Sequence, residues 1–162
     1  MKKLVFLMLF MGSVFASQAQ SNYNTGIGIA LGSPSGLNVK HFVNDNAAIQ
    51  GIAGWYFNNY KSSVGLTALY QIHRVAFDVP DLLWYYGLGG HVGVATWDND
   101  DDDPNNDNES TAWIGIDLCI GLEYTIPNAP INFSLELVPG INLLPGTEPG
   151  IGADLGIRYV FK

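Results

Sequence analysis

The 162-residue chain has little charge, a single cysteine and almost no basic character. Charged residues make up 14% of it, well below the roughly 25% of ordinary soluble proteins. Seven lysines and arginines stand against fifteen acids, and the formal charge is −8. Without a basic patch, binding to a nucleic-acid phosphate backbone is excluded.

Long apolar runs are also missing beyond the N-terminus, where no stretch reaches the roughly 18 residues of a membrane-spanning helix. Hydrophobic residues nevertheless make up 48% of the chain, which excludes a disordered protein. The length is that of one domain. Cys119 has no partner for an internal disulfide, so stability has to come from a large core or a closed sheet.

The first nineteen residues have the pattern of a secretory signal peptide. Lys2 and Lys3 form a positive start, residues 4–11 are continuously apolar, and Ser17, Gln18 and Ala19 supply a small-residue cleavage site. We therefore expect a signal peptide over 1–19 and one mature domain over 20–162. No cysteine lies near the cleavage site, which excludes a lipid-anchored N-terminus.

From residue 24 onward, apolar and polar or small residues alternate with a period of two, and no helical stripe appears. The clearest run is 112–126, where isoleucines and leucines occupy every second position. Turn-forming clusters of Gly, Pro, Asn and Asp separate the runs. We expect eight strands, over 24–31, 37–43, 47–56, 64–73, 82–97, 112–126, 131–137 and 151–161.

The two faces of these strands indicate the surroundings of the protein. The apolar face is continuous and ends in aromatic residues, among them Trp84, Tyr124, Tyr159 and Phe161. The other face is rich in glycine, which suits a narrow polar interior better than a solvated surface. This pattern predicts an all-β fold, an eight-stranded antiparallel up-and-down transmembrane β-barrel, with lipid outside.

Charged residues on the inner face are expected to pair with one another inside the barrel. The predicted ionic network of the interior comprises Lys40, Asp117, Glu123, Glu136, Asp154 and Arg158. In an eight-stranded barrel the lumen is just wide enough for side chains, so we expect this network to fill it.

Connection lengths support the same arrangement, with both termini on the inner side. The inner turns are expected at 44–46, 74–81 and 127–130. The outer loops are expected at 32–36, 57–63, 98–111 and 138–150, and three of them exceed two of the inner turns. Bacterial barrels have the same asymmetry.

The whole mature chain resembles the small outer-membrane β-barrels of Gram-negative bacteria, the group of the OmpA and OmpX type. Its closing segment is similar to their C-terminal signal for the barrel-assembly machinery, with Gly156, Ile157, Tyr159 and Phe161 as the matching residues. Lys162 departs from that pattern, because it makes the aromatic residue penultimate. The resemblance implies an outer-membrane location, lipid as surroundings and no assigned activity.

An acidic segment carries seven of the fifteen acids between residues 98 and 109. Asp98, Asp100, Asp102 and Glu109 occupy positions one, three, five and twelve of a calcium loop, but Asp103 stands where that loop needs glycine. A solvated loop of repelling charges is the favoured interpretation. The alternative is weak Ca²⁺ binding that bridges to lipopolysaccharide phosphates.

Catalytic chemistry finds little support. His41, His73, His91 and Ser134 are separated in the sequence, and no zinc spacing occurs. We therefore expect that the protein is not an enzyme and binds no cofactor. An outer-membrane lipid-modifying enzyme would need a serine and a histidine at the same depth near the outer rim, and the sequence offers no such pair. A soluble lipocalin-like barrel with its aliphatic face turned inward around an apolar ligand stays open as the alternative.

Overall fold

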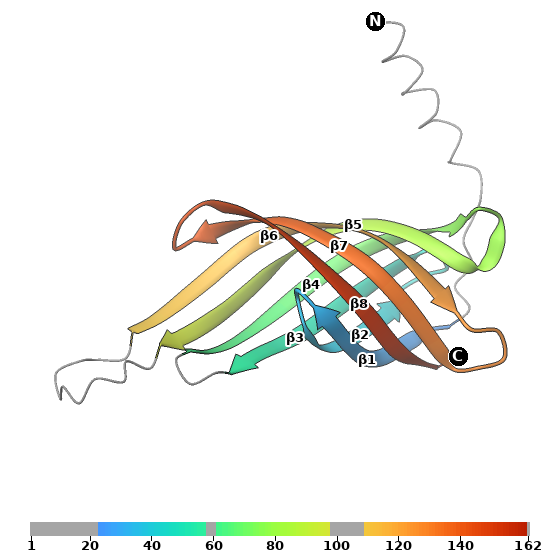
Figure 1. Ribbon diagram of the computed structural model, residues 1–162. Coiled ribbons are helices and arrows are strands. Elements are labelled where there is room, and N and C mark those ends of the chain that lie inside the picture. Colours follow the sequence, from blue (N-terminus) through green and yellow to red (C-terminus); the bar gives the residue numbers. More distant parts are fainter. Residues whose placement is uncertain (1–22, 58–60, 98–108, 162) are drawn as a thin grey trace, which may run out of the picture.

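The computed structural model describes residues 23–57, 61–97 and 109–161, and these residues form eight β-strands (Figure 1). No helix in these ranges is long and apolar enough to cross a membrane. The strands are β1 (Thr25–Gly32), β2 (Gly36–Phe42), β3 (Ala47–Phe57), β4 (Lys61–Ala76), β5 (Val79–Trp97), β6 (Glu109–Thr125), β7 (Ile131–Leu144) and β8 (Glu148–Phe161).

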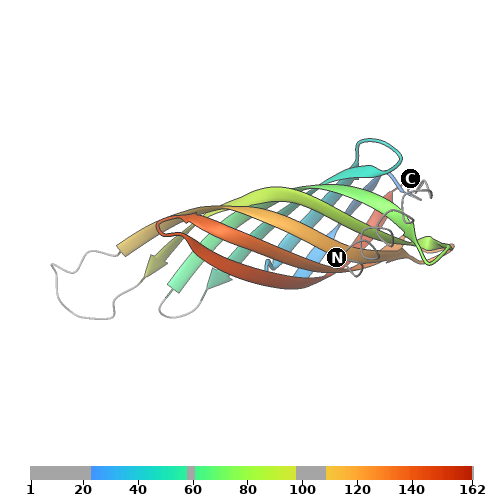
Figure 2. The ribbon, with the colours of Figure 1, turned by 90° about the horizontal axis from the view of Figure 1, so that it is seen from above.

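Each strand pairs antiparallel with the next, and β8 pairs with β1 to close the barrel. Thr25 stands opposite Phe161 in that closing pair, so the first strand begins where the last one ends. The β2–β3, β4–β5 and β6–β7 connections lie at this same end (Figure 2). The predicted fold, an all-β barrel of eight antiparallel strands, is confirmed.

Large apolar side chains cover the outside of this barrel. On β6 the exposed residues are the even-numbered ones, with Leu118 60% exposed, and Leu118 faces Leu88 of β5 across the outer surface. The intervening positions turn inward, where Asp117, Cys119 and Glu123 are buried. This orientation is the reverse of the one that the lipocalin-like alternative requires.

Strand pairing extends into several of the expected connections, most of all into those over 74–81 and 138–150. The expected turn over 74–81 consists only of Phe77 and Asp78, both with positive φ, because β4 and β5 continue to either side. Positive φ is unusual for phenylalanine, so the sequence carried little signal for this two-residue turn.

The expected outer loop over 138–150 is also mostly strand. β7 and β8 continue pairing from Val138 opposite Gly152 to Asn142 opposite Glu148. On its other side, the pairing of β7 with β6 passes over Val138 and Pro139. The missing proline N–H therefore interrupts only one side of the strand.

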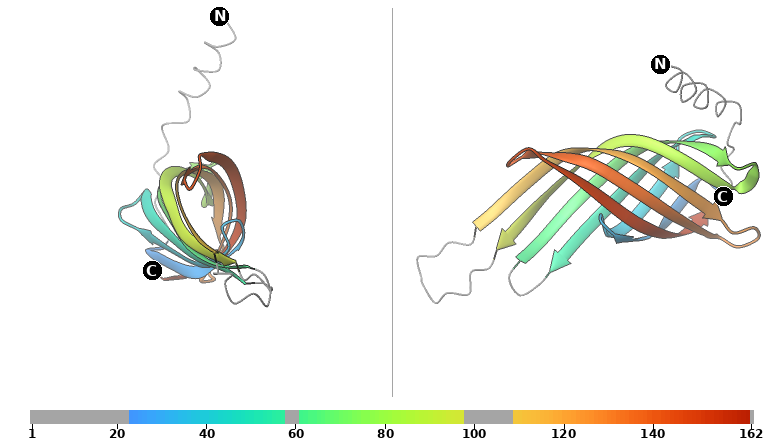
Figure 3. Two further views of the ribbon diagram at one scale, coloured as in Figure 1. Left: turned by 90° about the vertical axis from the view of Figure 1, so that its left-hand side faces the viewer. Right: turned by 45° about the horizontal axis from the view of Figure 1, so that its top comes forward.

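The strands differ greatly in length. β1 and β2 have 8 and 7 residues, whereas β5 has 19 and β8 has 14. The β1–β2 hairpin therefore stops well short of its neighbours at the end away from the chain terminus (Figure 3). The barrel wall is therefore shorter along the barrel axis at β1 and β2 than at the other strands.

Candidate functional site

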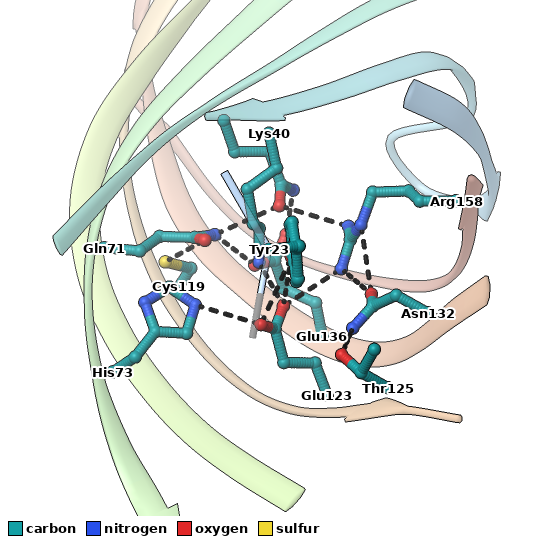
Figure 4. A network of polar contacts seen from close by, with 11 residues as sticks. Tyr23, Lys40, Gln71, His73, Cys119, Glu123, Thr125, Asn132, Glu136 and Arg158 are labelled. Carbon is teal, nitrogen blue, oxygen red and sulfur yellow. Dashed lines mark hydrogen bonds and ion pairs between the residues drawn. The ribbon is translucent and has the colours of Figure 1, made fainter. Parts of the chain in front are cut away.

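A buried ionic network occupies the interior near the end where β8 finishes (Figure 4). Glu123 is its centre: the Oε2 atom lies 2.8 Å from Lys40 Nζ and 3.1 Å from Arg158 Nη2. These three side chains are at most 1% exposed and come from β6, β2 and β8. One carboxylate thus forms ion pairs with two cations held on separate parts of the wall.

Aromatic rings close this network on one side. Tyr23, just before β1, donates a hydrogen bond to Glu123 at 3.3 Å and packs edge-on against Phe42. Burial, together with the charge of Glu123, raises the pKa of the Tyr23 phenol well above its ordinary value, so the phenol is a neutral donor. The Lys40 ammonium also lies over the Tyr85 ring, 4.0 Å from its centroid.

Neutral amides hold the second carboxylate. Glu136 accepts hydrogen bonds from Gln50 Nε2 at 2.9 Å and from Gln71 Nε2 at 2.6 Å. Arg158 donates to Asn132 Oδ1 at 2.7 Å. The sequence prediction named only charged residues and missed these amides, although their inward positions in the alternating pattern were a usable signal.

The six residues of the predicted network do not form one cluster. Lys40, Glu123 and Arg158 are ion-paired, and Glu136 lies among the amides beside them. Asp117 instead pairs with His91, whose Nδ1 lies 2.8 Å from its carboxylate. The grouping of Asp117 with the two cations is therefore corrected: position along the strand, which charge alone does not reveal, places it nearer the opposite end.

Asp154, the last of the six predicted network residues, is buried without a hydrogen-bond partner among the described residues. It is 2% exposed, and neither carboxylate oxygen has a hydrogen-bond partner among the described residues. Its cross-strand partner is Glu136, another acid. An unpaired buried carboxylate beside a like charge opposes folding.

Replacing Asp154 with asparagine is therefore expected to stabilise the barrel by about 1 kcal/mol, the difference between burying an unpaired carboxylate beside Glu136 and burying an unpaired neutral amide. The midpoint of urea-induced unfolding in lipid vesicles measures the effect. Asp45→Asn, an exposed change in the β2–β3 connection, serves as the control. A lower midpoint for Asp154→Asn would show that this carboxylate has a stabilising partner.

Glycines on the inner wall provide the space for large interior side chains. A Cβ atom at Gly121 would lie 2.5 Å from the Tyr85 ring and 2.7 Å from the Leu135 carbonyl oxygen. Since that backbone oxygen cannot move aside easily, the position requires glycine. The glycine-rich face read from the sequence is thus a packing requirement of the lumen.

Gly121→Ala is expected to cost about 1–3 kcal/mol through overpacking against Tyr85. Gly146→Ala is the matched control, because a Cβ there meets nothing within 4 Å. The same urea titration should lower the midpoint only for Gly121→Ala. Equal midpoints for the two variants would contradict the packing role of Gly121.

The calcium prediction falls largely outside the described part of the chain. Asp98, Asp100 and Asp102 lie outside the described residues, and Glu109 is the first residue of β6. Within the described ranges, no group of three or more His, Cys, Asp or Glu residues is arranged to hold a metal ion. Calcium binding by the acidic segment stays a prediction.

The predicted assembly signal forms the end of β8. Tyr159 and Phe161 point outward with ring centroids 5.0 Å apart, while Gly156 lies on the inner face. Ile157 stands opposite Ile29 of β1, within the pairing that closes the barrel. Recognition of this segment by an assembly machinery stays a prediction.

The candidate catalytic residues remain separate. His41 contacts Thr25 on the surface, His73 is buried beside Tyr85, and His91 pairs with Asp117. Ser134 is buried. No serine–histidine hydrogen bond occurs among the residues that the structure describes, so they offer no activated serine.

Known proteins resemble this chain in fold but not in sequence. No protein-family model matches it, and no curated protein matches it in sequence. Among solved structures, Neisserial surface protein A is similar with a TM-score of 0.53 and 12% sequence identity, over 85% of this chain and 93% of that one. At this identity the likeness shows a shared barrel fold.

Proposed function

We propose that this protein is an integral outer-membrane β-barrel with a structural or surface-interaction role carried by its outer loops. One observation carries the proposal: the barrel is apolar outside and polar inside. Exposed residues such as Leu88 and Leu118 form a continuous apolar exterior that water would solvate poorly. In hydrocarbon, the closed hydrogen bonding of the barrel is required as well, because no sheet edge can be left open.

The interior is closed to large solutes under this proposal. This part of the proposal is supported by the ion pairs of the network, which join side chains of β2, β6 and β8 across the lumen. An eight-stranded barrel is wide enough for side chains and no more. Surface interaction, rather than conduction of large solutes, is the role that this architecture supports.

The proposed outer-membrane location also implies what surrounds the protein. Outer-membrane lipid contacts the apolar exterior, and the end of β8 engages the barrel-assembly machinery during biogenesis. As part of this proposal, the acidic segment between β5 and β6 binds divalent cations weakly, and these cations bridge it to lipopolysaccharide phosphates. The N-terminal nineteen residues act as a cleaved export signal.

Fractionation combined with a heat-modifiability gel tests the location. A closed barrel resists SDS until it is boiled, so the protein is expected in the outer-membrane fraction with a band that shifts on heating. Recovery in the soluble periplasmic fraction with no shift would overturn the proposal.

A further inference from the structure

The outer half of the lumen contains a cavity of about 410 Å³, separate from the ionic network. Ile52 and Val138, both buried, contribute its apolar surface, and Val138 packs on Leu69 and Cys119 inside the barrel. The volume is within the range of small-ligand sites. An apolar layer thus lies between this cavity and the network around Glu123.

Two side chains that line the cavity, Trp113 and His91, pack closely against glycines of the barrel wall. A Cβ at Gly93 would overlap the Trp113 indole, and one at Gly115 would overlap the His91 ring. His91 is fully engaged by its neighbours, with Nδ1 2.8 Å from Asp117 and Nε2 2.7 Å from Asn142. His91, Asp117 and Asn142 therefore bind one another, and Trp113 contributes an apolar surface to the cavity.

The cavity also has a side opening, which the register of the strands defines. Pairing of β2 with β3 ends at Gly54, and pairing of β1 with β8 ends at Asp154. Beyond these points the cavity is bordered by residues 33–35 of the β1–β2 turn, by Gly54 and Trp55 of β3 and by residues 150–152 of β8, and this border is the gap between β3 and β8 at the tip of the short β1–β2 hairpin, whose place in the barrel Figures 1 and 3 show. Because β1 and β2 lie between β3 and β8 in the barrel, the gap that they leave is three strand spacings wide, about 14 Å. A Cβ at Gly150, on the gap-facing part of β8, meets nothing within 4 Å.

The length of the hairpin places this gap at the depth of the lipid. A strand needs about 9–11 residues to cross the hydrocarbon layer, whereas β1 and β2 have 8 and 7. Exposed apolar side chains border the gap, with Leu31 and Leu37 on the hairpin and Trp55 and Ile151 on its two sides. The gap therefore opens toward hydrocarbon.

We propose that this cavity binds the hydrocarbon chain of an amphiphile that enters sideways from the outer leaflet through the gap between β3 and β8. The proposal rests on the membrane location proposed above. Among the described residues that line the cavity, the carboxylates are Asp117, which contacts His91, and Glu148, and there is no lysine or arginine. The headgroup is therefore zwitterionic or neutral rather than anionic.

Tryptophan fluorescence in bilayers of brominated lipid tests the entry of a chain. A variant with Trp55, Trp84 and Trp97 replaced by phenylalanine leaves Trp113 as its reporter, and a second variant retains only Trp84 on the outer surface. Bromine on acyl chains quenches an indole that the chains touch. In brominated phosphatidylcholine we expect Trp113 to lose emission to an extent comparable with Trp84.

The outcomes separate the two proposals. Quenching of Trp84 but not of Trp113 would overturn the lateral site and leave the membrane location standing. Quenching of neither residue would overturn both. Brominated phosphatidylglycerol should quench Trp84 as before but Trp113 less, and equal quenching of Trp113 by both lipids would contradict the headgroup preference.

A matched pair of glycine variants tests the route. Gly150→Phe places a ring in the open space of the gap, whereas Gly146→Phe adds the same ring in the β7–β8 turn, also in open space. In the Trp113-only chain, Gly150→Phe is expected to abolish most of the quenching and Gly146→Phe to leave it. Unchanged quenching in Gly150→Phe would show that the chain does not pass this gap.

Discussion

Replacing Glu123 with glutamine is expected to destabilise the barrel by about 3–5 kcal/mol, the cost of breaking a buried ion pair by removing one partner. Glu123 is the only carboxylate within ion-pair distance of Lys40 or Arg158 among the described residues. Glutamine fills the same space but leaves both cations, each at most 1% exposed, without the carboxylate that pairs with them. The loss should exceed that of every other single change in the network.

Urea titration of the protein refolded into lipid vesicles measures this loss. Glu136→Gln is the matched control, because Glu136 accepts its hydrogen bonds from the neutral amides of Gln50 and Gln71. A much smaller loss is expected for it. Equal losses for the two variants would show that Glu123 has no special role in neutralising the cations.

Introducing an arginine at Leu118 is expected to cost about 2–4 kcal/mol, the penalty for a cation on the lipid face near the middle of a bilayer. Leu118 lies in the middle of β6 and is 60% exposed on the apolar exterior. In a water-soluble protein, a charge at so exposed a position changes stability by less than about 0.5 kcal/mol. The loss of stability caused by Leu118→Arg therefore shows whether this face of the barrel contacts lipid or water.

The control for this change lies on the same face of the same strand. Ser110 is exposed near the outer end of β6, where an arginine costs only about 0–1 kcal/mol because the membrane interface is close. Urea titration in vesicles compares Leu118→Arg with Ser110→Arg. A Leu118→Arg barrel as stable as the control would contradict contact of this face with lipid.

The alternation of side chains allowed most of the fold to be predicted from the sequence. In β6 the period of two is unbroken from Ala112 to Tyr124, so each residue was assigned to the correct face. The glycine-rich character of the inner face then identified the interior as narrow. Both signals are local, because neighbouring residues on a strand alternate between its faces.

Features that depend on register could not be predicted in this way. The stagger between strands fixes which of the six interior charges meet. Asp117 accordingly pairs with His91 away from the cluster, and Asp154 lies opposite Glu136 with no hydrogen-bond partner among the described residues. The gap beside β1 and β2 likewise arises from a difference in strand length around the closed barrel. Alternation within one strand carries no information about either feature.

Spin-label accessibility along β6 tests the central claim, that the aliphatic face contacts lipid, most directly. With Cys119 replaced by serine, single cysteines at Ile116, Leu118 and Ile120 carry nitroxides on the outer face of the barrel in vesicles. We predict high collision rates with oxygen, which dissolves in hydrocarbon, and low rates with a water-soluble nickel complex. High collision rates with nickel at all three positions would mean that this face lies in water, and would contradict the account.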